Sequence, residues 1–175
     1  GYAHADTTLD IMVLYDADTA QRFNNQPETM IRNFVEQANQ MYRNSGVQVQ
    51  LRLVHTARHD ASGSTMSQVL QNVTNDASVR ELRNRYGADF VTQIRRTGNC
   101  GVAWLSTGQN GQFNRSTPEW AYSVIGSRCG ALVLAHEVGH NMGLAHSRAQ
   151  GDTSGGVFHH GLGHGVYNAF ATIMA

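Results

Sequence analysis

The stretch HEVGHNMGLAH, from His136 to His146, places three histidines and a glutamate in an otherwise apolar run. His136 and His140 are four residues apart, so on a helix their imidazoles share one face, about one turn from each other. Two nitrogen donors so placed can bind one Zn²⁺ ion. Glu137 is turned about 100° around the helix, so it is poorly placed to bind that ion but can reach a water on it. His-Glu-x-x-His is a zinc-protease motif.

The third histidine makes the motif specific. A catalytic zinc usually has three protein ligands and one water. Gly143 tolerates the left-handed conformation that ends a helix and reverses the chain, so His146 can return as the third ligand. The sequence matches His-Glu-x-x-His-x-x-Gly-x-x-His at every fixed position. A structural zinc is disfavoured, because such sites are closed by a fourth protein ligand, often Cys, and the segment contains no cysteine.

A three-histidine site with an open position predicts hydrolysis of peptide bonds. Zinc lowers the pKa of its water from about 16 toward 7 and polarises the substrate carbonyl. Glu137 is expected to act as general base toward that water and then as general acid toward the leaving amine. A binding protein with a vestigial protease fold is the competing class, and Glu137 argues against it because binding alone does not need this carboxylate.

Hydrophobic periodicity outside this segment predicts strands that alternate with helices. Strands are expected at residues 8–16, 47–55, 88–95, 100–108 and 121–129. Helices are expected at residues 27–46 and 131–143, with two short helices or one broken helix at 64–73 and 78–87. Residues 109–119 form a polar loop, and the Gly-rich residues 146–165 have no period. The fold class is therefore α/β or α+β, with one twisted, mostly parallel sheet packed on two long helices.

Two of the strands carry finer expectations. The continuous apolar run at 8–16 predicts a central strand buried on both faces. The strand at 47–55 alternates, which predicts one buried face made of Val47, Val49, Leu51 and Leu53. Two histidines near its end, His55 and His59, are expected on the surface.

Composition limits the classes of partner. The 175 residues suit one domain, and 41% are hydrophobic. The formal net charge of zero argues against nucleic-acid binding and against a polybasic membrane surface. No apolar run approaches the roughly 20 residues that span a bilayer. A protein or peptide substrate and a monomeric state are expected.

Through its His-Glu-x-x-His-x-x-Gly-x-x-His motif, the sequence resembles the metzincin clan of zinc endopeptidases. The resemblance implies a sheet of four parallel strands and one antiparallel edge strand on long helices. It also implies a Met-turn beneath the zinc, for which ATIMA with Met174 is the candidate. The clan's edge strand pairs with the substrate backbone. GVAWL is the candidate for that strand, with substrate-binding residues Gly101, Val102, Ala103 and Trp104.

Within the clan, CGVAWL, AYSVIGSRC, HEVGHNMGLAH and GHGVYNAFATIMA together look most like bacterial peptidyl-Asp metalloendopeptidases. These enzymes cut on the amino side of aspartate, which implies a cationic group for the P1′ carboxylate. Candidates lie in the loop after the third ligand and are Arg148, His159, His160 and His164. Ser147 follows that ligand as in matrixins, so a hydrophobic P1′ preference is the alternative. The loop histidines could also bind a second metal, and Asp152 could belong to a calcium loop, although neither is supported by spacing.

The first residue is glycine, which is typical of a chain processed from a secreted precursor. In a secreted protein Cys100 and Cys129 are expected to form a disulfide; two buried thiols are the alternative. We treat residues 1–175 as one metalloprotease catalytic domain. The sequence stops one residue after Met174, so the outer S1′ wall and C-terminal helix of the clan are expected to be absent and the activity reduced.

Overall fold

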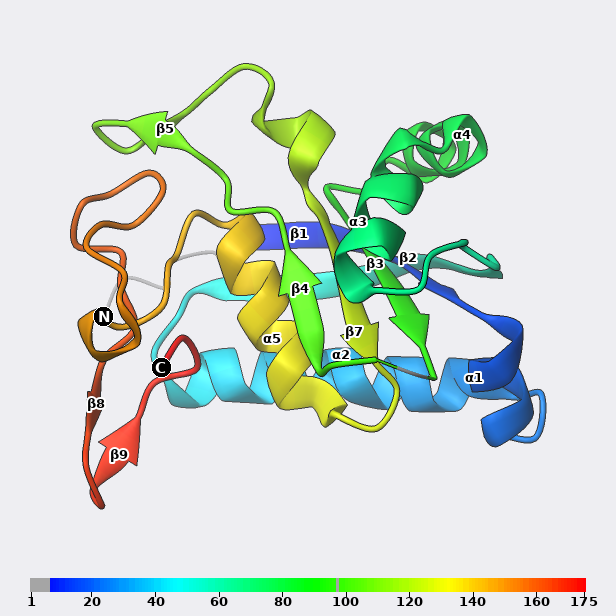
Figure 1. Ribbon diagram of the computed structural model, residues 1–175, viewed down its shortest axis with the longest axis horizontal. Helices are drawn as coiled ribbons and strands as arrows, with labels where there is room; N and C mark the ends of the chain where they lie inside the picture. Colours follow the sequence, from blue (N-terminus) through cyan, green and yellow to red (C-terminus); the bar gives the residue numbers. More distant parts are fainter. Residues whose placement is uncertain (1–6, 97) are drawn as a thin grey trace.

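The computed structural model describes residues 7–96 and 98–175, and a five-stranded mixed sheet forms its centre (Figure 1). The strand order is β2 (Val49–Arg58), β1 (Thr7–Tyr15), β3 (Phe90–Arg95), β7 (Tyr122–Gly126) and β4 (Gly101–Ala103). The first four strands are parallel, and β4 pairs antiparallel with β7 at the edge. The predicted sheet class is confirmed, including the antiparallel strand near Gly101.

Five α-helices are found in the described residues and cover both faces of this sheet. They are α1 (Ala17–Arg22), α2 (Pro27–Asn44), α3 (Met66–Asn75), α4 (Ala77–Tyr86) and α5 (Gly130–Asn141). Figure 1 shows α2 and α5 on one side of the sheet and α3 and α4 on the other. The two long predicted helices are therefore α2 and α5.

Strand β1 shows why the sheet is buried on both faces. Its side chains alternate, so Ile11 and Val13 join one apolar cluster with α2 and α5. Met12 and Leu14 join a second cluster with α3. All four residues are at most 1% exposed, which confirms the prediction of a strand buried on both sides.

The predicted start of β2 is wrong. The strand begins at Val49, and Val47 is 43% exposed instead of facing the core. The reason is that the N–H of Val47 donates to Tyr42 O, so this residue still closes the end of α2. Gly46 turns the chain there with a φ of 68°. Leu51 is buried as predicted.

The segment after β2 forms two separate helices. Asp76 ends α3 and caps α4, because its carboxylate accepts from the N–H groups of Ser78 and Val79. His59 is not a free surface residue: its ring lies between Asp76 Oδ2 and Gln93 Oε1, 3.0 Å from each. His55 is also half-buried and stacks on a tyrosine ring at 3.8 Å.

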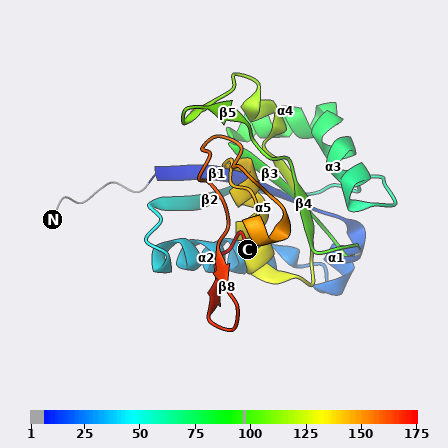
Figure 2. The same cartoon turned by 60° about the vertical axis from the view of Figure 1, so that its left-hand side comes forward.

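The segment between β4 and β7 and the residues after α5 contain only short elements. The expected loop at 109–119 and the tail hold two small hairpins and two 3₁₀ turns. They are β5 (Gly108–Gln109) with β6 (Gln112–Phe113), β8 (Gly165–Val166) with β9 (Phe170–Ala171), η1 (Thr117–Trp120) and η2 (Arg148–Gln150). Figures 1 and 2 show the β8–β9 hairpin projecting past α2. In residues 7–96 and 98–175 no helix is both long and apolar enough to cross a membrane.

Candidate metal centre

Three histidine rings converge where α5 meets the segment that follows it. His136 and His140 lie on one face of α5, and His146 follows the turn at the end of the helix. Its Nε2 atom is 3.2 Å from the Nε2 atoms of both other rings. In the part of the chain that the structure describes, this is the one group of three His, Cys, Asp or Glu residues able to hold a metal ion.

The other ring nitrogens of His136 and His140 show that the Nε2 atoms of these two rings face the site as acceptors. Nδ1 of His136 lies 2.6 Å from Ile173 O, and Nδ1 of His140 lies 2.7 Å from Leu144 O. Carbonyl oxygens only accept, so each Nδ1 carries the proton and each Nε2 presents a lone pair. Burial also lowers the pKa of His140, which favours its neutral form.

The third ring is oriented by a carboxylate. Asp152 Oδ2 lies 3.3 Å from Nδ1 of His146 and accepts from the backbone N–H of the same residue at 2.8 Å. A carboxylate or carbonyl on the distal nitrogen fixes the tautomer of a metal ligand and raises its basicity.

This donor set fits zinc. The Nε2 lone pair of His146 lies 3.2 Å from each of the other two Nε2 atoms, and lone pairs this close repel one another unless a cation lies between them. Zn–N bonds of about 2.0–2.1 Å at tetrahedral angles place ligand nitrogens about 3.3 Å apart, close to the spacing in the protein. His136, His140 and His146 would hold the ion.

The turn that brings His146 back depends on Gly143. Its φ is 88°, a left-handed conformation that glycine adopts without strain. A Cβ at this position would lie 2.6 Å from Cγ2 of Val157, so the loop packs directly against the bare backbone. The predicted role of Gly143 as the end of the helix is consistent with this geometry.

Met174 lies directly against the middle of α5. It is 5% exposed, and its sulfur would be 2.5 Å from a Cβ on Gly139. Gly139 precedes the ligand His140, so a methionine in a turn packs against the metal-binding helix where a side chain is missing. The assignment of Met174 to a Met-turn stays a prediction.

Glu137 projects from α5 toward β4. It is 5% exposed, and burial raises its pKa to about 7. A divalent cation bound beside it would favour the ionised carboxylate. The carboxylate makes no hydrogen bond with any described residue.

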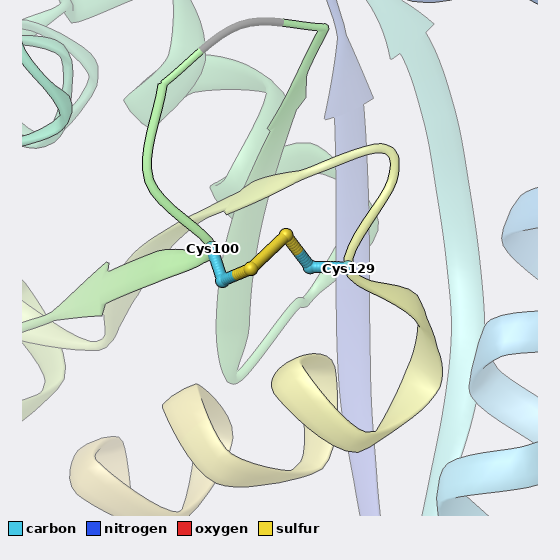
Figure 3. The surroundings of a disulfide bond; sticks show 2 residues. All are labelled: Cys100 and Cys129. Carbon is cyan, nitrogen blue, oxygen red and sulfur yellow. A yellow bond between two sulfur atoms is a disulfide. The ribbon is translucent and has the colours of Figure 1, made fainter.

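Strand β4 and the start of α5 are joined covalently. The disulfide Cys100–Cys129 links the residue before β4 to the residue before α5 (Figure 3). The N–H of Gly126 also donates to Cys100 O at 2.8 Å. The predicted pairing is therefore present in the structure. Trp104 lies just beyond β4, but its N–H still donates to Tyr122 O of β7.

Several predicted residues do not join the three histidines. Arg148 starts η2 and is exposed. His159, His160 and His164 are exposed and do not form a metal-ligating group among the described residues. Asp152 contacts His146 and forms no acidic cluster of the kind a calcium loop would have with any residue in 7–96 and 98–175.

Besides the contact between Asp152 and His146, four contributions were missed by the sequence reasoning. The carbonyl groups of Leu144 and Ile173 orient two ligands, and a carbonyl group carries no residue-specific signal. Gly139 and Gly101 make room for Met174 and Glu137. Their type alone was the available signal, because glycine is unfavourable inside a helix or strand unless another group approaches closely.

Comparison with known proteins agrees with this geometry. Residues 5–174 match metallo-peptidase family M12, and the chain belongs to that family. Zinc is the metal of the family, and the three-histidine group is the place for it.

Two relatives carry the name peptidyl-Asp metalloendopeptidase. The one from Pseudomonas aeruginosa is 37% identical over 192 aligned residues, which cover 98% of this chain and 32% of the relative. The one from Xanthomonas campestris pv. campestris is 29% identical over 177 residues, covering 96% of this chain and 40% of the relative. The chain thus spans 32% and 40% of the length of these two relatives.

A solved structure supports the fold alone. It is described as a chaperone-substrate complex and aligns with all of this chain and 28% of its own, with a TM-score of 0.80 and 21% sequence identity.

Proposed function

We propose that residues 1–175 are the catalytic domain of a zinc endopeptidase that cuts on the amino side of aspartate. The observation that carries the proposal is the convergence of three acceptor nitrogens, His136, His140 and His146, beside the buried carboxylate of Glu137. A structural or binding role for the metal would need the three histidines but not this carboxylate.

The chemistry divides between the metal and one side chain. Zinc, when bound, supplies a Lewis acid and a water of lowered pKa. Glu137 holds a proton taken from that water and gives it to the leaving amine, so it acts first as base and then as acid. Its burial between α5 and β4 keeps bulk water away from this transfer. Met174 supports the helix that carries two of the ligands.

Strand β4 offers a place for the substrate backbone. It pairs with β7 on one side, and its other edge pairs with no strand in residues 7–96 and 98–175. A peptide that adds to this edge through main-chain hydrogen bonds would pass beside Glu137. Gly101, Val102, Ala103 and the adjacent Trp104 are the residues we assign to it.

Cleavage before aspartate is supported by the names of the two relatives. Arg148, His159, His160 and His164 remain the candidates for the cation that meets the aspartate, because they are exposed in the segment after the third ligand. A peptide library with every P1′ residue tests this proposal. Cuts mainly before large apolar residues would instead support the matrixin-like alternative.

The substitution Glu137→Gln tests the mechanism. It keeps the size of the side chain and removes its basicity, so zinc content should be unchanged and kcat should fall by roughly 10²-fold or more. Glu36→Gln, an exposed change on α2, is the matched control and should retain activity. Unchanged turnover in Glu137→Gln would refute the mechanism. Zinc binding without proteolysis in the unaltered protein would instead favour a binding protein.

We also propose that the protein is secreted from a bacterial cell as a processed monomer. Support comes from the disulfide, which persists in oxidising compartments, and from the bacterial source of both relatives. Fractionation of the producing culture, N-terminal sequencing of the recovered protein and light scattering on it test the location, the processing and the oligomeric state.

A further inference from the structure

Gly101 of β4 and Glu137 of α5 are in direct contact. A Cβ atom built on Gly101 would lie 2.3 Å from Oε1 of Glu137 and 2.8 Å from both Cδ and Cγ. These separations are far below the van der Waals contact of about 3.5–4.0 Å between carbon atoms. The glutamate side chain therefore occupies the volume that any other residue at position 101 would fill.

The backbone does not require glycine at this position. Gly101 has ordinary strand geometry and is absent from the glycines with positive φ, unlike Gly143. It is paired with Ile125 of β7 in a regular antiparallel register. Glycine weakens a strand and is usually found where another group approaches closely. Here that group is the side chain of Glu137.

The position of the Glu137 carboxylate depends on this contact, because hydrogen bonds do not fix it. No described residue donates to the carboxylate. The helix fixes its Cα, and the bare backbone of β4 sets how far the side chain can extend. The Cys100–Cys129 disulfide ties the strand and the helix together one residue before Gly101. The two surfaces that enclose Glu137 are thus held at a constant separation.

We infer that Gly101 is a positioning residue for the general base. By lacking a side chain, it lets the Glu137 carboxylate lie against β4 in the place from which it serves the water at the zinc site. The inference rests on the proposed function, and it assigns Gly101 a role separate from main-chain pairing with the substrate. That pairing uses N–H and C=O groups, which a methyl group on Gly101 leaves in place.

The substitution Gly101→Ala tests the inference. The new methyl group would force the carboxylate into another rotamer, and a displacement of about 1 Å can cost on the order of 10²-fold in rate. We expect kcat to fall by roughly 10–100-fold, while KM and the Kd for zinc stay within about twofold. A crystal structure of the metal-free variant should show the Glu137 carboxylate displaced by about 1 Å or more. Gly165→Ala is the control, because a Cβ there meets nothing closer than 3.3 Å.

A double-mutant cycle separates positioning from general damage. Aspartate at position 137 is one methylene shorter, so Glu137→Asp should cost much less activity in the Gly101→Ala background than in the unaltered protein. If the Gly101→Ala protein fails to fold because its methyl group clashes with the Glu137 side chain, the double variant Gly101→Ala with Glu137→Ala should fold, because the second change removes the clash. Failure of both variants to fold would overturn the inference.

The outcomes also distinguish this inference from the proposed function. The positioning role would be refuted if the Gly101→Ala protein had a normal kcat or an unmoved Glu137 carboxylate. It would also be refuted if the activity losses of Gly101→Ala and Glu137→Asp simply added in the double variant. The proposed function would still stand if Glu137→Gln abolished turnover. Full activity of Glu137→Gln would instead remove the function on which the inference rests.

Discussion

Asp152 orients one zinc ligand, and replacing it with asparagine should weaken zinc binding without unfolding the chain. In the protein its carboxylate accepts from the backbone N–H of His146 at 2.8 Å and lies 3.3 Å from Nδ1 of the same ring. The amide oxygen of Asn can still accept one of these hydrogen bonds, so the loop should keep its shape. What is lost is the negative charge that faces Nδ1 of the ring.

The magnitude follows from the arrangement of the three ligands. Two rings donate to neutral carbonyl groups, and only His146 is oriented by a charge. Removal of one such partner typically costs 10–100-fold in metal affinity, or about 1.4–2.7 kcal/mol. Asp152→Ala removes the backbone hydrogen bond as well, which adds about 1 kcal/mol of lost stability.

Competition with a chromophoric chelator at pH 7.5 measures the Kd for zinc, and urea unfolding of the metal-free proteins measures stability. Asp18→Asn is the control, because it removes an equal charge from the first turn of α1. The reasoning is refuted if Asp152→Asn binds zinc within twofold of the unaltered protein, or if the control weakens binding equally.

Three further predictions concern the stability of the fold and of the zinc site. Gly143→Ala introduces a side chain at a φ of 88°, which should lower the free energy of unfolding by about 1–3 kcal/mol and weaken zinc binding, as urea unfolding and zinc titration would show. Replacing Cys100 and Cys129 together by serine opens a 29-residue link and should cost about 3–4 kcal/mol in the chain-entropy model, measured by urea unfolding of the metal-free protein. The pKa of Asp76 is lowered in the folded protein, mainly by the hydrogen bond from the Ser78 hydroxyl. The ionised carboxylate therefore stabilises the fold above about pH 4, the pKa of an aspartate in the unfolded chain. This stabilisation is lost as the pH falls through the pKa of Asp76 in the folded protein. Between about pH 5 and pH 2 the Tm of Asp76→Asn should therefore fall less than that of the unaltered protein; equal slopes would contradict this.

The parts of the site that could be predicted are those with a local rule. Ligands four residues apart on a helix, followed by a glycine and a third histidine, define a metal centre because helix geometry alone places the first two. The alternation in β1 likewise predicts its two buried faces.

The parts that could not be predicted depend on contacts across long sequence separations. Ile173 reaches His136 through a backbone carbonyl, and any residue type could supply that group. Val47 has the pattern of a strand residue, but the end of α2 holds its N–H. His59 was placed on the surface because its partners Asp76 and Gln93 come from other elements.

The hydrogen bond from His136 to Ile173 also has a consequence for biosynthesis. The ribosome makes α5 first, then the turn with His146 and the loop with Asp152, and only later Ile173 and Met174. A nascent chain that has α5 but not yet these two residues lacks the acceptor for one ligand and the methionine that packs on Gly139. Tight zinc binding should therefore begin only when Ile173 and Met174 have left the ribosome.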